Sequence, residues 1–309
     1  MWLGFLGFIL LVLALDLYVF NGRKAQAVSM KKAAAWSVIW VILSLSFNGL
    51  LWLYLNHTAT PAIADARSLE FFTGYLLEKS LSVDNMFVFL MIFNFFAVPP
   101  EYQRRVLIYG VLGAILLRTI VILFGSWLLE EFHWILYLFG AFLLLTGIKM
   151  ILFAEKKADL NENMLLKWLR KCLPVTNEFV KDKFIVIKDA KRFVTPLFLV
   201  LILVEVADLV FAVDSVPAVF AITTDPFIVW TSNIFAILGL RALFFLLANL
   251  ADRFHLLKFG LAIILAFIGA KMLLMDIYPI SIGLALLIVT VVLAVSMIGS
   301  LLIKPKGER

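Results

Sequence analysis

The sequence has few residues that carry thiol, imidazole or nucleotide chemistry. Its 309 residues include one cysteine, Cys172, and three histidines. A single cysteine excludes an intramolecular disulfide, and metal sites of the zinc or copper type lack their usual thiolate and imidazole ligands. The sequence also contains no G-x-x-x-x-G-K phosphate-binding pattern, which argues against direct drive by ATP.

Charge is also scarce, and long apolar segments take its place. Charged residues make up 16% of the chain, apolar residues make up 64%, and the mean hydropathy is +1.05. A membrane-spanning helix needs roughly 20 consecutive apolar residues. The composition predicts an all-α polytopic membrane protein with about nine transmembrane helices, over residues 2–20, 33–55, 69–96, 106–129, 132–153, 194–222, 229–250, 254–275 and 280–302.

The positions of the basic residues predict how the chain is oriented. Lysine and arginine gather at 21–32, 97–105, 154–193, 251–258 and 303–309, whereas the alternate loops hold only Arg67. Because basic loops stay in the cytoplasm, we expect the N-terminus outside and the C-terminus inside. The net charge of +6 therefore indicates contact with the lipid bilayer, and we expect no nucleic-acid partner. The first apolar run lacks a basic leading region and a cleavage motif, so we interpret it as a retained helix.

Two three-helix blocks, residues 69–153 and 194–275, read as copies of one another. Residues 132–150 align without gaps with residues 254–272, and Asp84 and Arg118 precede the first stretch as Asp214 and Arg241 precede the second. An odd number of helices per block inserts the second block upside down, as in secondary transporters with midplane binding sites. Alternatively, the duplication only builds a pseudo-symmetric bundle. The other segments are two leading helices (1–68), a cytoplasmic loop (154–193) and a final helix with a basic tail (276–309).

Five acidic residues lie deep in the two blocks. They are Glu78 and Asp84 in the first, and Glu205, Asp208 and Asp214 in the second. A carboxylate at bilayer depth costs at least about 2.5 kcal/mol, so such residues are kept where they function or are paired. With oxygen atoms from Ser82, Asn85 and Ser215, they form a ligand set suited to Mg²⁺, Ca²⁺ or Mn²⁺.

Two arginines supply the alternative interpretation. Arg118 and Arg241 lie in the middle of apolar segments and always carry a charge, so we expect them to pair with some of the acids. If all acids were paired in this way, the set would be a scaffold rather than a binding site. Asp16 lies near the cytoplasmic end of the first helix, where it is either a gate or second-shell residue of the site or an acid at the membrane interface. Glu70 is left outside the site because it starts its helix on the outer side.

Local signals predict breaks and surface contacts. Gly74, Pro196 and Pro217 are plausible interruption points, and the helices could also unwind between the paired acids. Lys149 and Lys271 are expected to reach opposite membrane surfaces. Within the cytoplasmic loop, residues 164–172 predict an interfacial helix and residues 184–188 a short extended piece.

The phrases around the acids resemble the two signature motifs of the TerC family of integral membrane proteins. They read Glu78-Lys-Ser-Leu-Ser-Val-Asp84-Asn85 and Glu205-Val-Ala-Asp208-Leu-Val-Phe-Ala-Val-Asp214-Ser215. The resemblance covers nearly the whole chain, and the layout is similar to the Alx branch of the family. It implies a manganese exporter of the bacterial inner membrane, linked to the response to alkaline pH, with these five acids as its metal site. The resemblance also implies a historical link to tellurium resistance, but tellurite is an oxyanion, and a path lined by acids favours a cation instead.

Three functions compete at this stage. The first is a carrier that exports Mn²⁺, either in exchange for protons or down the metal's own gradient, with no resident cofactor. The second is a membrane scaffold that delivers metal to secreted proteins through partners that the sequence leaves unknown. The third is an intramembrane aspartyl hydrolase, but Val83 and Val213 stand before the aspartates where such enzymes carry glycine. We therefore expect a transporter and not an enzyme.

Overall fold

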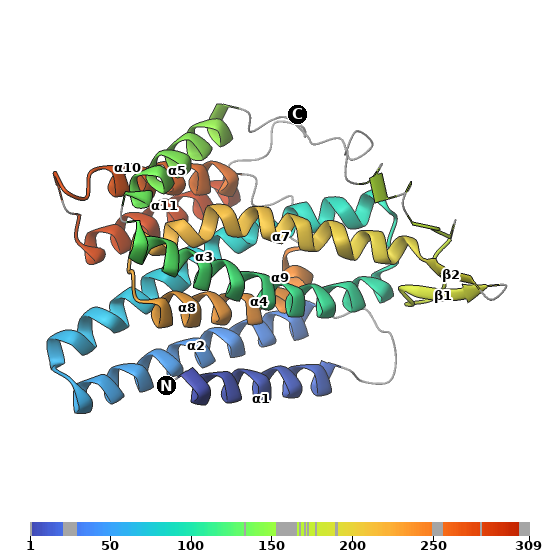
Figure 1. Ribbon diagram of the computed structural model, residues 1–309, viewed down its shortest axis with the longest axis horizontal. Coiled ribbons are helices and arrows are strands. Elements are labelled where there is room, and N and C mark those ends of the chain that lie inside the picture. Colours follow the sequence, from blue (N-terminus) through green and yellow to red (C-terminus); the bar gives the residue numbers. More distant parts are fainter. Residues whose placement is uncertain are drawn as a thin grey trace.

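The computed structural model is a bundle of helices with a small strand hairpin projecting from one end (Figure 1). It describes residues 2–20, 30–132, 134–152, 166, 168–169, 171, 173–176, 178–188, 191–248, 256–278 and 280–302. Within these ranges the side chains of Leu3, residues 15–20, Asp84, Phe87 and Asp214 lie outside the description.

Each predicted apolar segment coincides with a helix, except that the segment predicted at 229–250 coincides with the bent pair α8 and α9, so the all-α membrane class is confirmed. Five described helices are long and apolar enough to cross a membrane, or six if the bent pair α8 and α9 is one span; nine crossings and the inverted repeat stay predictions. The helices are α1 (Trp2–Phe20), α2 (Met30–Thr58), α3 (Pro61–Phe95), α4 (Pro100–Glu131), α5 (Ile135–Leu152), α7 (Pro196–Phe220), α8 (Pro226–Leu238), α9 (Leu240–Leu247), α10 (Leu257–Leu273) and α11 (Ile282–Leu302).

Proline starts helices here and does not interrupt them. Pro196 is the first residue of α7, where its missing N–H costs no hydrogen bond, and α3, α4 and α8 also begin with proline. α7 continues through Pro217 close to its end, and α3 continues through Gly74. The expected breaks at these three positions are therefore wrong. Nor do the helices unwind between the paired acids, because α3 and α7 are continuous across residues 78–84 and 208–214.

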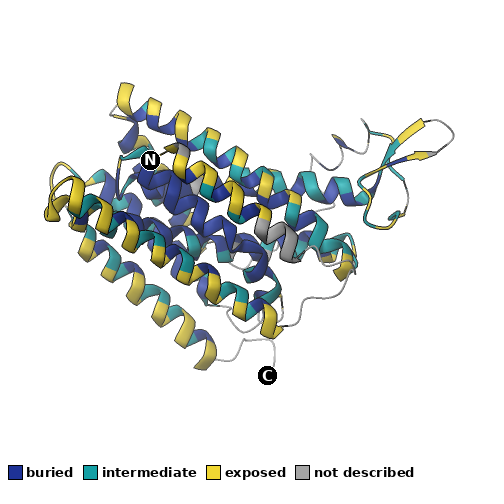
Figure 2. Ribbon diagram, turned by 90° about the horizontal axis from the view of Figure 1, so that it is seen from below, coloured by how far each residue is buried: buried dark blue, intermediate teal, exposed yellow. Residues whose placement is uncertain are grey.

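A different residue, Gly239, marks the break. It separates α8 from α9, and the two helices meet at a bend of 44°. α8 lies at the centre of the bundle, and every residue from Phe227 to Leu238 is buried. Figure 2 shows the same pattern for the whole bundle, with buried residues inside and exposed residues on the peripheral helices. The exposed residues include large apolar side chains such as Leu116, Leu145 and Val295, as a lipid-facing surface requires.

The helices α5 and α10 pack very closely through glycine. A Cβ atom added at Gly147 would lie 2.6 Å from Ala266 N and 2.7 Å from Ala262 O. A Cβ atom added at Gly269 would lie 2.6 Å from Gly140 O and closer still to Leu144 N. At the offset of 122 between the aligned stretches, Gly140, Leu144 and Gly147 of α5 correspond to Ala262, Ala266 and Gly269 of α10. Each glycine therefore meets the residues equivalent to those that the other glycine meets. Such reciprocity is what a two-fold axis between the helices produces.

The segment between α5 and α7 contains two short antiparallel strands, β1 (Ile185–Lys188) and β2 (Lys191–Val194). The extended piece expected at 184–188 is thus confirmed as a strand. Most of the residues of the predicted interfacial helix lie outside the described part of the chain.

Candidate functional site

A fully buried arginine lies at the centre of the site. Arg118 occupies the middle of α4 and has 0% of its side chain exposed. A buried guanidinium cannot lose its proton, so it needs carboxylates and several hydrogen-bond acceptors around it. Its surroundings therefore show which of the predicted acids the fold brings together.

Two acids from different blocks surround this guanidinium. Arg118 Nη2 lies 2.9 Å from Asp208 Oδ1, and Nε donates to Asp208 Oδ2 at 3.1 Å, which is a two-pronged pairing. Arg118 Nη1 also forms an ion pair with Glu78 Oε1. Glu78 is 0% exposed and Asp208 is 2% exposed. One cation thus links α3 of the first block to α7 of the second.

Two neutral side chains complete the cluster. Arg118 Nη1 donates to Asn233 Oδ1 at 3.1 Å and to Ser215 Oγ at 3.4 Å. The Asn233 amide nitrogen donates to Glu78 Oε2 at 3.1 Å. Asn233 lies on α8, outside the sequence motifs that predicted the site. The available signal was an amide in the middle of an apolar helix of 13 residues.

The charges of this cluster do not balance when both acids are ionised. One guanidinium faces the carboxylates of Glu78 and Asp208, which leaves an excess of one negative charge. In a site without bulk water such an excess is stable only with a proton or a second cation. The expectation that the arginines pair with acids is met for Arg118, but this pairing alone does not neutralise the site.

Glu205 lies one helical turn before Asp208 and differs from it. Its side chain is half-buried against Gly113 of α4, where an added Cβ atom would collide with the carboxylate. Glycine at this position therefore lets the acid approach the backbone of α4. Among the described residues, Glu205 Oε2 has no hydrogen-bond partner. Glu205 is thus an acid at mid-helix that no described base neutralises.

The other predicted residues have different positions. Ser82 Oγ donates to the Glu78 carbonyl on its own helix at 2.7 Å, and Asn85 is buried. Arg241 lies on α9 and is 5% exposed. The side chains of three predicted residues lie outside the described part of the structure, so their role stays a prediction; they are Asp16, Asp84 and Asp214. Among the described residues there is no group of three or more acids, histidines or cysteines placed to hold a metal.

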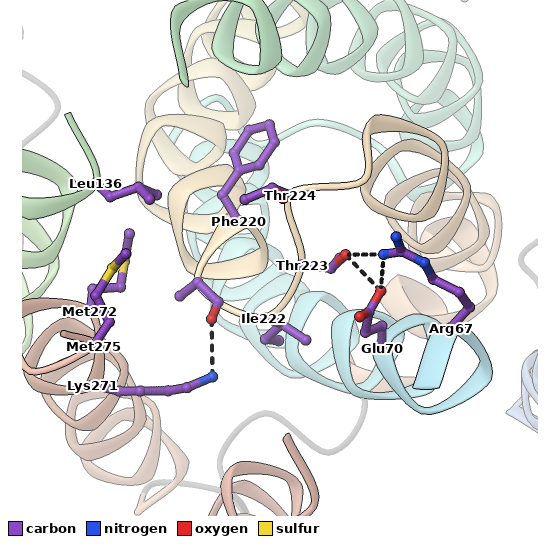
Figure 3. A pocket seen from close by; sticks show the side chains of 11 residues that line it. Arg67, Glu70, Leu136, Phe220, Ile222, Thr223, Thr224, Lys271, Met272 and Met275 are labelled. Carbon is purple, nitrogen blue, oxygen red and sulfur yellow. Dashed lines mark hydrogen bonds and ion pairs between the residues drawn. The ribbon is translucent and has the colours of Figure 1, made fainter. Parts of the chain in front are cut away.

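A second polar region lies at the end of the bundle where α3 begins and α7 ends. A pocket of about 310 Å³ is bordered there by Arg67, Glu70 and Lys271 (Figure 3). Arg67 Nη1 lies 2.7 Å from Glu70 Oε2, and both contact the hydroxyl of Thr223. Lys271 is 9% exposed and donates to the Ala221 carbonyl at 3.0 Å. The Lys271 ammonium thus binds the carbonyl end of α7 at the end of the bundle, and Lys149 is exposed; that the two lysines reach opposite membrane surfaces stays a prediction.

Comparisons with known proteins agree on one family. The model of the integral membrane protein TerC family matches residues 64–308. The protein Alx of Escherichia coli (strain K12), described as a candidate membrane-bound redox modulator, is 55% identical over 96% of this chain and 93% of its own length. An uncharacterized membrane protein of Myxococcus xanthus is 44% identical over 98% of this chain and 92% of its own. No solved structure matches the chain.

Proposed function

The chain belongs to the integral membrane protein TerC family, and on this basis we propose that it is a secondary transporter that exports divalent manganese from the cytoplasm. The observation that supports this proposal best is the buried cluster of Glu78, Asp208 and Arg118. It joins the two three-helix blocks and contains two acidic side chains for one arginine. Intramembrane acids that face the bundle interior are typical of ion pathways.

The acids have two different roles in this proposal. Arg118 holds Glu78 and Asp208 as a fixed counter-cation and keeps the blocks together between transport events. Glu205, with Asp84 and Asp214 as predicted partners, supplies the oxygen ligands that a hard divalent cation prefers. The choice of manganese among such cations comes from the family resemblance.

Export of a divalent cation needs a driving force. A membrane potential that is negative inside opposes export by about 2.3 kcal/mol per charge per 100 mV. Because the sequence has no P-loop motif, we propose coupling to protons, and the uncompensated carboxylate in the site provides a group that can bind one. A redox role, as in the description of Alx, would need a second cysteine if it used a dithiol within the chain, and the sequence has one.

Transport by the purified protein tests the proposal. Liposomes that contain the purified protein inserted inside-out, and that are loaded with a pH-sensitive dye, should take up Mn²⁺ while protons leave their lumen. We expect Asp208→Asn and Glu205→Gln to reduce uptake at least tenfold, because each removes one charge from the site. Glu101→Gln is the matched control, because Glu101 is an exposed acid in the first turn of α4. Uptake by both site variants equal to that of the control variant would contradict the proposal. An absence of flux that a partner protein restores would favour the metal-delivery scaffold.

A further inference from the structure

The break between α8 and α9 has a specific partner on a neighbouring helix. Lys79 of α3 donates from Nζ to the Ala236 carbonyl at 3.1 Å. In a continuous helix that carbonyl would accept a hydrogen bond from the Leu240 amide, four residues later. Among the described residues no bond from the Leu240 amide to the Ala236 carbonyl is present. The preceding amide, that of Gly239, donates to the Ile237 carbonyl, which ends the regular pattern of α8. The lysine therefore replaces a backbone donor at the break.

The space at Gly239 fits the lysine. A Cβ atom added at Gly239 would lie 2.6 Å from Lys79 Nζ and 3.2 Å from Trp40 Cβ. The backbone of Gly239 has φ −85°, which any residue adopts, so space rather than conformation selects glycine here. The ammonium also lies at the carbonyl end of α8, where the helix dipole favours a cation. Insertion of a side chain into the helix ladder is a recognised cause of a sharp kink.

The predicted repeat shows that this feature belongs to one half only. At the offset between Asp84 and Asp214, the position equivalent to Lys79 is Leu209 on α7. The helix equivalent to α8 and α9 is α4, which is continuous over 32 residues. Lys79 of the first block thus binds the broken helix of the second block, whereas the equivalent residue of the second block, Leu209, has no ammonium to offer to the unbroken α4 of the first block.

The surroundings of α9 leave room for movement. A cavity of about 470 Å³ lies beside it, bordered by Lys79 and by residues of α3, α9, α10 and α11. Its lining is almost entirely apolar, with Leu243, Leu246 and Leu247 contributed by α9. Arg241 lies two residues beyond the break, so a change in the bend would move it relative to Asn233 and the buried cluster.

We propose that Lys79 is a positioning residue that holds the helix broken at Gly239 through the Ala236 carbonyl, and that its release lets α8 and α9 join and α9 swing into the adjacent cavity. Glu78 and Lys79 then act together on α8, one through Asn233 and the other through Ala236. The link between this motion and metal transport rests on the proposed function. The hydrogen bond from Lys79 to the Ala236 carbonyl, which we call the latch, does not rest on the proposed function, because it concerns only the conformation of α8 and α9.

Distance measurements on the full chain test the latch directly. Spin labels at Ala248, past the end of α9, and at Leu301, on the exposed side of α11, report the position of α9 in a Cys172→Ser background reconstituted in lipid. Straightening a bend of 44° would move the tip of α9 by about 9 Å, from a rise of roughly 1.5 Å per residue. We expect Lys79→Met to shift the label distance by several ångströms in most molecules, and Gly239→Ala, which displaces the ammonium, to do the same.

Ser80→Ala is the matched control. Ser80 borders the same cavity, but its hydroxyl donates to Leu76 on its own helix, so the variant should keep the parent distance. An unchanged distance in folded Lys79→Met protein would overturn the latch. In the transport assay we expect Lys79→Met to lower the maximal Mn²⁺ flux about tenfold with little change in KM. A shifted distance in Lys79→Met with normal flux would overturn the role of the latch in transport. If the parent protein itself showed no Mn²⁺ flux while Lys79→Met still shifted the distance, only the proposed function would be contradicted.

Discussion

A guanidinium that has no contact with solvent, such as that of Arg118, is stable only together with the groups around it. It faces two carboxylates, an amide and a hydroxyl from three other helices. Removal of one partner of a buried pair costs more than removal of all partners, because it leaves an uncompensated charge. The separate contributions of charge and packing at this position can therefore be measured.

We predict that Arg118→Met lowers the free energy of unfolding by about 3 to 5 kcal/mol, since Glu78 and Asp208 lose their counter-cation. The triple variant with Glu78→Gln and Asp208→Asn should recover most of this loss, because no buried charge remains. Thermal unfolding in detergent measures both effects. Arg105→Met is the control, since Arg105 pairs with Asp182 at the surface, where ion pairs contribute at most about 1 kcal/mol. A triple variant as unstable as Arg118→Met would show that the arginine acts by packing alone.

At the scale of single residues, the sequence indicated the acids and their charged partner Arg118, but not every neutral side chain around them. Glu78, Asp208 and Arg118 stand out because charge is rare in apolar segments. Asn233 did not, because an uncharged amide gives a weaker signal, and its role depends on α8 passing through the centre of the bundle. Lys79 also lies in an apolar segment, but in the structure its ammonium binds a backbone carbonyl rather than an acid. Backbone acceptors at a helix break leave no mark in the sequence.

At the scale of helices, hydrophobic length predicted where each element lies, but proline and glycine did not predict where helices break. Pro196 begins α7, Pro217 lies close to its end, and Gly74 packs against Ser232 inside α3. The observed break at Gly239 arises from a lysine on another helix and from Trp40. It is a tertiary effect, which residue-by-residue propensity does not contain.

The contact between α5 and α10 gives a prediction at the same scale. We expect Gly147→Val and Gly269→Val to destabilise the protein by similar amounts, about 1 to 3 kcal/mol each, because both would force the same pair of backbones apart. Thermal unfolding of the purified variants measures this. Gly283→Val is the control, since an added Cβ atom there would meet no atom within 4 Å. If one variant were as stable as the control and the other were not, the reciprocal contact would not reflect a two-fold relation.

At the scale of the whole molecule, the direction of these two helices supports an inverted repeat. Gly140 lies near Met272 and Gly147 near Ala262, so α5 and α10 run antiparallel. Equivalent helices that run in opposite directions are related by an axis in the membrane plane. The sequence predicted this relation from an odd helix count and a basic loop. It did not predict that Arg118 would bind acids of both blocks, because that depends on how the blocks pack.

The orientation in the membrane is a prediction that labelling of single cysteines checks. The hairpin of β1 and β2 and the turn between α7 and α8 lie at opposite ends of α7 (Figure 1). Because the basic residues of 154–193 should keep the hairpin in the cytoplasm, Ile187→Cys should resist an impermeant thiol reagent in intact cells, whereas Thr224→Cys should react. Both sites are exposed, and Cys172→Ser removes the native thiol. Permeabilised cells, in which both should react, provide the control. The reverse labelling pattern would contradict the predicted orientation and place the pocket of Arg67 and Lys271 on the cytoplasmic side.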